Sequence, residues 1–123
     1  MSLSATAFRV RRVYDPPEEA DGLRVLVDRL WPRGLAKARA EVDEWVKELT
    51  PSNELRTWLH THPERYDAFA ERYRGELAAA GPDAEATAER LRAAAARGPV
   101  TLLTAVKEPD HSHVPVLLDH LRG

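Results

Sequence analysis

The stretch LRVLVDRL at residues 23–30 is the strongest indication of the fold. Its centre, residues 25–27, is a continuous run of β-forming apolar residues, which is typical of a strand buried on both faces. The sequence WPRG follows at residues 31–34, and its proline and glycine end any regular structure. Residues 100–106 (VTLLTAV) form a second run of the same kind. Residues 8–14 (FRVRRVY) alternate between apolar and basic side chains and predict a third, half-exposed strand.

Most of the remaining chain has helical periodicity. Val42, Trp45, Val46 and Leu49 are spaced at i, i+3, i+4 and i+7, which is one face of a helix. Similar patterns, separated by proline and glycine, predict further helices over residues 51–61, 63–80, 83–97 and 114–121. The prediction is an α/β fold: a small three-layer domain in which a short, mainly parallel sheet from residues 8–14, 24–30 and 100–106 is flanked by about five helices.

No linker or repeat divides the chain, so residues 8–122 are expected to form a single domain, preceded by a flexible N-terminus at residues 1–7. One connection leaves the topology open. The loop at residues 15–22 is shorter than the dozen or so residues that a crossover between parallel neighbours normally requires. The first two strands therefore form either a parallel pair or an antiparallel hairpin.

The composition excludes several classes of protein. The 123 residues include no cysteine, which excludes disulfides, a thiolate nucleophile and cysteine-ligated metals. No apolar run is long enough to span a membrane and no signal peptide is evident, so we expect a cytoplasmic protein with no membrane partner. Basic and acidic residues number 18 and 20, which argues against a uniformly basic surface for nucleic acid. No cofactor is predicted, because glycine-rich phosphate-binding loops are missing.

Polar residues follow the two most apolar strands, at the position where open parallel sheets bind ligands. The end of the strand at residues 23–30 supplies Asp28, Arg29, Trp31 and Arg33. The segment after the strand at residues 100–106 supplies Lys107, His111, Ser112 and His113 and leads into a helix. Guanidinium groups, a lysine and a helix N-terminus all favour an anion. The sequence therefore predicts an anion-binding crevice formed by Arg29, Arg33, Lys107 and Ser112, with Trp31 as a wall and Asp28 and His113 as candidate catalytic groups.

Each of these assignments has a plainer alternative. The two arginines are equally compatible with surface positions or with ion pairs to a carboxylate such as Asp28. Asp28 itself is more often a salt-bridge partner than a base. The segment Trp31-Pro32-Arg33-Gly34 reads as a rigid corner, in which Gly34 adopts a backbone angle closed to other residues. That corner either aims Arg33 at the crevice or only redirects the chain.

Histidines and aromatic residues offer weaker signals. The pairs His60/His62 and His111/His113 lack a third ligand at a recognised spacing, so no metal site is predicted. The aromatic residues are helically spaced, which favours core packing over a base-stacking platform; they are Trp45, Trp58, Tyr66, Phe69 and Tyr73. Arginines between them, Arg56 included, are expected to solvate outer helix faces and to pair with nearby glutamates.

The string at residues 25–34, VLVDRLWPRG, resembles the YeaO-like proteins, a bacterial family of unknown function. The resemblance extends over residues 8–121 and includes Trp58, Arg65-Tyr66 and His111-Ser112-His113. It implies an α/β sheet protein with no established activity. Longer relatives carry a cysteine, a histidine and an arginine after the last strand, where this chain has Ser112-His113-Val114. Thiol chemistry of that kind is therefore excluded here.

Two functional classes follow from these observations. The first is an enzyme or binding protein for a small anionic molecule, such as a phosphorylated one. The second is a nucleic-acid-associated or regulatory protein that uses the same basic cluster on a backbone phosphate. The near-neutral charge favours the first. A third class is an interaction module without catalysis, and the sequence does not define an oligomeric state.

Overall fold

The computed structural model describes residues 8–123, so the expectation of a flexible segment at residues 1–7 lies outside the described residues. The sheet has four parallel strands in the order β1-β4-β2-β3. They are β1 (Phe8–Arg12), β2 (Leu23–Leu26), β3 (Glu44–Trp45) and β4 (Val100–Thr104). The three predicted strands are confirmed, each ending a few residues earlier than expected. The prediction of an α/β fold with a mainly parallel sheet is therefore confirmed.

The hairpin alternative for the first two strands is wrong, because β4 lies between them. Phe8 of β1 and Leu23 of β2 both align with Val100 of β4. The connection is short because it contains only the 3-10 turn η2 (Glu19–Asp21) and no α-helix. It runs along one face of the sheet, where Thr101 donates a hydrogen bond to the Asp21 carbonyl at 2.7 Å and Arg11 reaches the Asp21 carboxylate.

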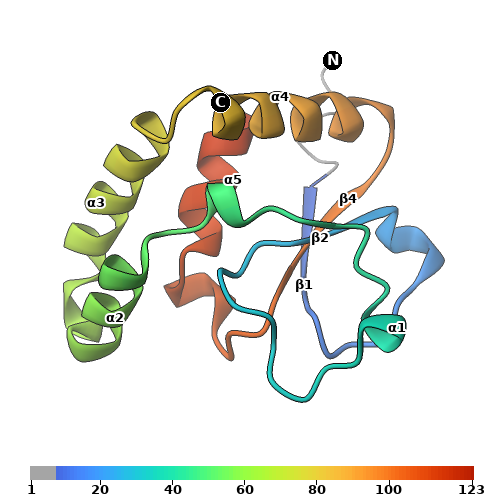
Figure 1. Cartoon of the computed structure of the whole chain (residues 1–123), viewed down its shortest axis with the longest axis horizontal. Coiled ribbons are helices and arrows are strands. Elements are labelled where there is room, and N and C mark those ends of the chain that lie inside the picture. Colours follow the sequence, from blue (N-terminus) through green and yellow to red (C-terminus); the bar gives the residue numbers. More distant parts are fainter. Residues whose placement is uncertain (1–7) are drawn as a thin grey trace.

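Four longer helices pack together beside the sheet (Figure 1). They are α2 (Asn53–Thr61), α3 (Tyr66–Ala78), α4 (Pro82–Arg97) and α5 (Val114–Arg122). The helices α2 and α3 form an antiparallel pair at one end, α4 runs across the top of the view, and α5 packs against both α3 and α4 (Figure 1). A single-turn helix, α1 (Lys37–Ala40), completes the five α-helices of residues 8–123. None of them is both long and apolar enough to cross a bilayer.

The predicted helix over residues 42–49 is wrong. This segment forms the edge strand β3 and a 3-10 turn, η3 (Lys47–Leu49). The amides of Asp43 and Val46 donate hydrogen bonds to the carbonyls of Arg24 and Leu26, so the segment pairs with the otherwise open edge of β2. Its apolar residues face opposite sides of the sheet, because Trp45 packs with Leu26 while Val46 packs with the helices. Backbone pairing with β2 thus overrides a helical spacing.

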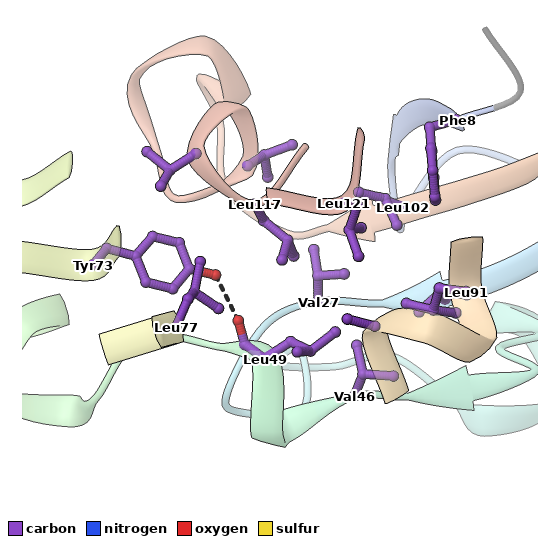
Figure 2. Packing of buried hydrophobic residues seen from close by; sticks show 14 of the residues in the cluster. Phe8, Val27, Val46, Leu49, Tyr73, Leu77, Leu91, Leu102, Leu117 and Leu121 are labelled. Carbon is purple, nitrogen blue, oxygen red and sulfur yellow. Dashed lines mark hydrogen bonds between the residues drawn. The ribbon is translucent and has the colours of Figure 1, made fainter. Parts of the chain in front are cut away.

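The two faces of the sheet are covered differently. Val25, Val27 and Leu102 point into a large core with α2–α5, and the Tyr73 hydroxyl donates to the Leu49 carbonyl there at 2.5 Å (Figure 2). Leu26 and Leu103 face the other way, into a smaller cluster. That cluster is covered by the loop between β2 and β3, which includes Trp31, Leu35 and Val42. The three layers are therefore helices, sheet and a thin loop layer.

The aromatic residues take mainly structural positions, as predicted, but not all are enclosed. Phe69 and Tyr73 are buried, with 1% and 0% exposure. Trp45 and Trp58 are half-buried. The Trp58 ring stacks on His62 at 4.7 Å between centroids and is covered by the Arg72 guanidinium, 4.4 Å from its centre. Trp58 therefore packs at the margin of the core rather than within it.

Candidate functional site

A cavity of about 610 Å³ opens where β2 and β4 end. Its walls come from the loop after β2, from α2, and from the segment between β4 and α5. Every site residue predicted from the sequence lines it: Asp28, Arg29, Trp31, Arg33, Lys107, Ser112 and His113. Two clusters almost eighty positions apart in sequence thus converge because parallel strands end at one edge of the sheet.

Asp28 joins the elements that form the cavity floor. Its Oδ1 accepts a hydrogen bond from the Thr104 hydroxyl at 2.7 Å, and its Oδ2 accepts one from the Ala105 amide at 2.7 Å. His113 Nε2 lies 3.3 Å from Oδ1. Burial alone would raise the pKa of Asp28, but the hydrogen bonds from His113, Ala105 and Thr104 outweigh it and lower that pKa. Asp28 is therefore a carboxylate fixed between the ends of β2 and β4 and the start of α5.

His113 is buried, with 7% exposure, and its ring nitrogen Nε2 donates to the Val27 carbonyl at 2.7 Å. Because a carbonyl oxygen can only accept, Nε2 carries a hydrogen in this arrangement. The same nitrogen lies 3.3 Å from Oδ1 of Asp28, and the ring meets Tyr73 edge-on at 6.4 Å between centroids. One nitrogen of His113 is thus committed to holding β2 and α5 together.

Arg29 and Arg56 both line the cavity, and both are anchored near the start of α2. Arg29 Nε donates to the Pro51 carbonyl at 2.9 Å, while the Arg56 amide is held by the Ser52 carbonyl in the first turn of the helix. The Arg56 Nε atom is buried and, within residues 8–123, has no hydrogen-bond partner. An orphaned buried donor costs about 1–3 kcal/mol. The side chain therefore lacks an acceptor next to the cavity.

The cations of the cavity form no ion pair with the part of the chain that the structure describes. Among the ion pairs of the described residues, none involves Arg29, Arg33, Arg56 or Lys107. Arg33 and Lys107 are exposed at the rim. Of the two carboxylates in the lining, Asp28 is engaged as described, and Glu108 is exposed. The cavity therefore has an excess of positive charge.

The segment from Trp31 to Gly34 forms the predicted corner. Gly34 has a positive φ of 74°, and the Trp31 indole donates to the Leu35 carbonyl at 2.8 Å, which closes the turn. The ring of Trp31 also meets Trp45 edge-on at 5.4 Å between centroids. The indole is thereby held as one wall of the cavity, and Arg33 stands on the corner without an ion pair to any described residue.

Ser112 lines the cavity, but its hydroxyl is already engaged. It donates to the Pro109 carbonyl at 2.6 Å and accepts from the Val114 amide at 3.1 Å. Because residue 115 is proline and Val114 is bonded to Ser112, two of the first amides of α5 are not free to receive a ligand. The start of α5 is therefore a weaker anion donor than the sequence suggested.

Helix α2 contributes lining residues that the sequence pattern did not predict. Arg56 was expected to solvate an outer helix face, but it lines the cavity with Leu59 and His60 of the same helix. These positions are spaced at i, i+3 and i+4, and that spacing could have revealed a shared face. His111, one of the polar residues predicted to follow the last strand, also lines the cavity.

The two histidine pairs are not arranged as metal sites. His113 bonds to Val27, while His111 lies edge-on to the Tyr66 ring. His62 stacks on Trp58, and its neighbour His60 lines the cavity. Within residues 8–123, no group of three or more histidine, aspartate or glutamate side chains could hold a metal ion.

A family model described as the inactive DUF488-N3 subclade matches residues 7–123. The chain belongs to this family. It is 47% identical to the uncharacterised protein YeaO of Escherichia coli over 116 residues, which is 94% of this chain and 97% of YeaO. It is also 47% identical to the uncharacterised protein Mb3100c of Mycobacterium bovis over 118 residues, 96% of each chain. The YeaO-like resemblance is confirmed. No solved structure matches this DUF488-N3 chain.

Proposed function

We propose that this protein binds a small oxyanion, a phosphate or a carboxylate, in the cavity beyond β2 and β4, without turning it over. The observation that carries the proposal is the set of four cations around one concave site, Arg29, Arg33, Arg56 and Lys107, none of which has a carboxylate partner among the described residues. Uncompensated cations that line a cavity favour an anionic occupant.

The geometry of the arginines supports a role in gripping the anion. Arg29 and Arg56 are half-buried and line the same cavity, and Arg29 bonds to the Pro51 carbonyl just before α2, the helix that carries Arg56. Planar guanidinium groups bind phosphate and carboxylate through paired hydrogen bonds. The buried Nε of Arg56 already lacks an acceptor, and a small shift of this side chain onto an oxyanion would supply one.

The environment of the two candidate catalytic groups favours binding over catalysis. A general base needs a free lone pair and a pKa near the working pH. Both oxygens of Asp28 accept hydrogen bonds from the protein, and its pKa is lowered. Nε2 of His113 carries its hydrogen towards the Val27 carbonyl and lies 3.3 Å from Asp28, so this nitrogen has no lone pair for a substrate. The description of the matching family as an inactive subclade agrees with this interpretation.

The proposal is tested by following amide signals in NMR spectra while inorganic phosphate is added. We expect shifts that saturate and that concentrate on residues 28–33, 51–60 and 105–113. The variant carrying Arg29→Gln and Arg56→Gln should bind at least about tenfold more weakly, because a charge-assisted hydrogen bond contributes about 1.5–3 kcal/mol. Arg97→Gln is the matched control, since Arg97 is exposed and precedes β4 at the other end of the sheet.

Two results would contradict the proposal. The first is phosphate affinity that is unchanged in the double variant. The second is binding of a DNA duplex to the same residues with a steep salt dependence, which would favour the nucleic-acid alternative.

A further inference from the structure

The cavity is much larger than the charged group that its arginines would hold. Its volume of about 610 Å³ falls in the range of roughly 300–1,000 Å³ that is typical of sites for small organic molecules. A phosphate or carboxylate group fills only a small part of such a space. The remaining volume is filled either by another part of the same ligand or by water.

A large part of the remaining lining is apolar, and it includes Leu30, Trp31, Pro51, Leu59, Phe69 and Val106. Two of these side chains have fixed positions: Phe69 is 1% exposed, and the Trp31 indole is held by the Leu35 carbonyl. Such a surface gains little from an inorganic ion, whereas it gains from an apolar group that displaces water.

The exposure of Leu30 is a second, independent indication that the ligand has an apolar part. Its exposure is 59%, and Tyr14 is the only other large apolar side chain of residues 8–123 that is exposed. A single exposed leucine is ordinary on a protein surface. This one, however, borders the cavity beside Arg29 and Trp31, where a bound molecule would cover it.

Charged and apolar positions lie next to each other on α2. Arg56 and Leu59 are three residues apart and therefore share a face of the helix, and both line the cavity. A ligand whose charged group meets Arg56 thus has an apolar contact one helical turn away. The site is matched to a molecule that has both parts.

We propose, on the basis of the function proposed above, that the ligand is an organic oxyanion: a phosphate ester or a carboxylate attached to an apolar body about the size of an aromatic ring. The charged group is bound by Arg29 and Arg56. The body lies against the apolar lining and covers Leu30 at the rim.

Titrations with four probes test this ligand class: phenyl phosphate, benzoate, inorganic phosphate and phenol. We expect phenyl phosphate or benzoate to bind roughly tenfold or more tightly than inorganic phosphate, because the ring buries apolar surface. Whichever of the two binds more tightly identifies the charged group. Phenol, which lacks the charge at neutral pH, should bind more weakly than both.

Variants of Leu30 separate the apolar body from the charged group. Leu30→Gln should weaken phenyl phosphate about threefold or more and leave inorganic phosphate unchanged, while Leu30→Met should retain both affinities. Because Leu30 is exposed, neither change should alter the thermal unfolding midpoint, and a melting curve checks this.

The failures of the two proposals are distinguishable. The organic ligand is overturned, and oxyanion binding left intact, if neither phenyl phosphate nor benzoate binds more tightly than inorganic phosphate, or if Leu30→Gln leaves the affinity for the tighter of the two unchanged. Phenol that binds as tightly as phenyl phosphate, or the absence of binding by every probe, overturns the oxyanion site itself.

Discussion

Two groups of arginines lie at different places on this sheet, and their surroundings differ. Near the start of β2, Arg11 and Arg24 bind the fully buried carboxylate of Asp21, at 2.8 Å and 2.5 Å. Beyond the end of β2, Arg29 and Arg56 border a cavity and pair with no carboxylate of residues 8–123. The first group is neutralised by a carboxylate of the protein itself, whereas the second faces a cavity that could hold an anionic ligand. The difference separates arginines that stabilise the protein from arginines that suit a ligand.

The Asp21 group shows what a completed arrangement looks like. Asp21 also accepts a hydrogen bond from the Glu18 amide at 3.0 Å, and Arg24 further donates to the Ala40 carbonyl at 2.9 Å. Burial alone would raise the pKa of Asp21, but the bonds from the Glu18 amide, Arg11 and Arg24 lower it. These contacts tie together β1, β2 and the loops on the thin face of the sheet.

The largest expected effect is the loss of Asp21. Asp21→Asn should lower the free energy of unfolding by about 3–5 kcal/mol, because it leaves the buried Arg24 without a counter-charge. Urea unfolding followed by circular dichroism measures the change. Asp110→Asn, at an exposed carboxylate, is the control and should remain near the wild type. A small effect at Asp21 would remove the distinction between the two arginine groups.

Acid should destabilise the protein through the same carboxylates. Asp21 and Asp28 have folded-state pKa values below their ordinary value of 3.8, so the unfolded chain binds more protons between the two values. Stability is then fully present above about pH 4 and is lost as pH falls through the lower folded values. Urea midpoints measured across this range should fall less steeply in Asp21→Asn than in the wild type. Equal slopes would show that Asp21 does not contribute.

Asp28→Asn should have an intermediate effect of about 1.5–3 kcal/mol. It removes a charge that accepts hydrogen bonds from Thr104 and Ala105, and the new amide group would face a donor. Glu108→Gln in the same cavity is the matched control, because Glu108 is exposed and forms no ion pair with described residues. If both variants unfold alike, Asp28 does not hold the cavity floor together.

The smallest expected effect on stability belongs to Arg33. Arg33→Lys should change the free energy of unfolding by no more than about 0.5 kcal/mol and leave the thermal midpoint almost unchanged. The reason is that the exposed Arg33 side chain makes no ion pair with the described residues. Affinity for phosphate should fall, because lysine lacks the planar fork. A clear loss of stability with unchanged affinity would show that Arg33 braces the corner instead.

The sequence predicted those parts of the fold that depend on local patterns. Continuous apolar runs located β2 and β4, and the rule that parallel strands end at one edge placed Arg29 near Lys107. The pairing of residues 44–45 with β2 was not predictable in this way. The spacing of Val42, Trp45, Val46 and Leu49 suits a helix, and only the open edge of β2 makes a strand more favourable there.

In the candidate site, too, residues placed by local patterns could be predicted from the sequence, and residues placed by packing could not. Residues that directly follow a strand were identified, because their position depends on the strand alone. Arg56 was missed, since its orientation towards the cavity depends on how α2 packs beside the loop at Pro51. The hydrogen bond from the Ser112 hydroxyl to the Pro109 carbonyl likewise depends on the 3-10 turn at Pro109–His111, which no periodic pattern in the sequence predicts.

The position of β4 has a consequence for how the protein folds. This strand lies between β1 and β2, although it comes long after both in the chain. Neither earlier strand can complete its main-chain hydrogen bonds until residues 100–104 are available. During synthesis, the edges of β1 and β2 that pair with β4 therefore stay unpaired while the helices between β2 and β4 are being made. The sheet closes only in a late, long-range step, and contacts between residues so distant in sequence are associated with slow folding.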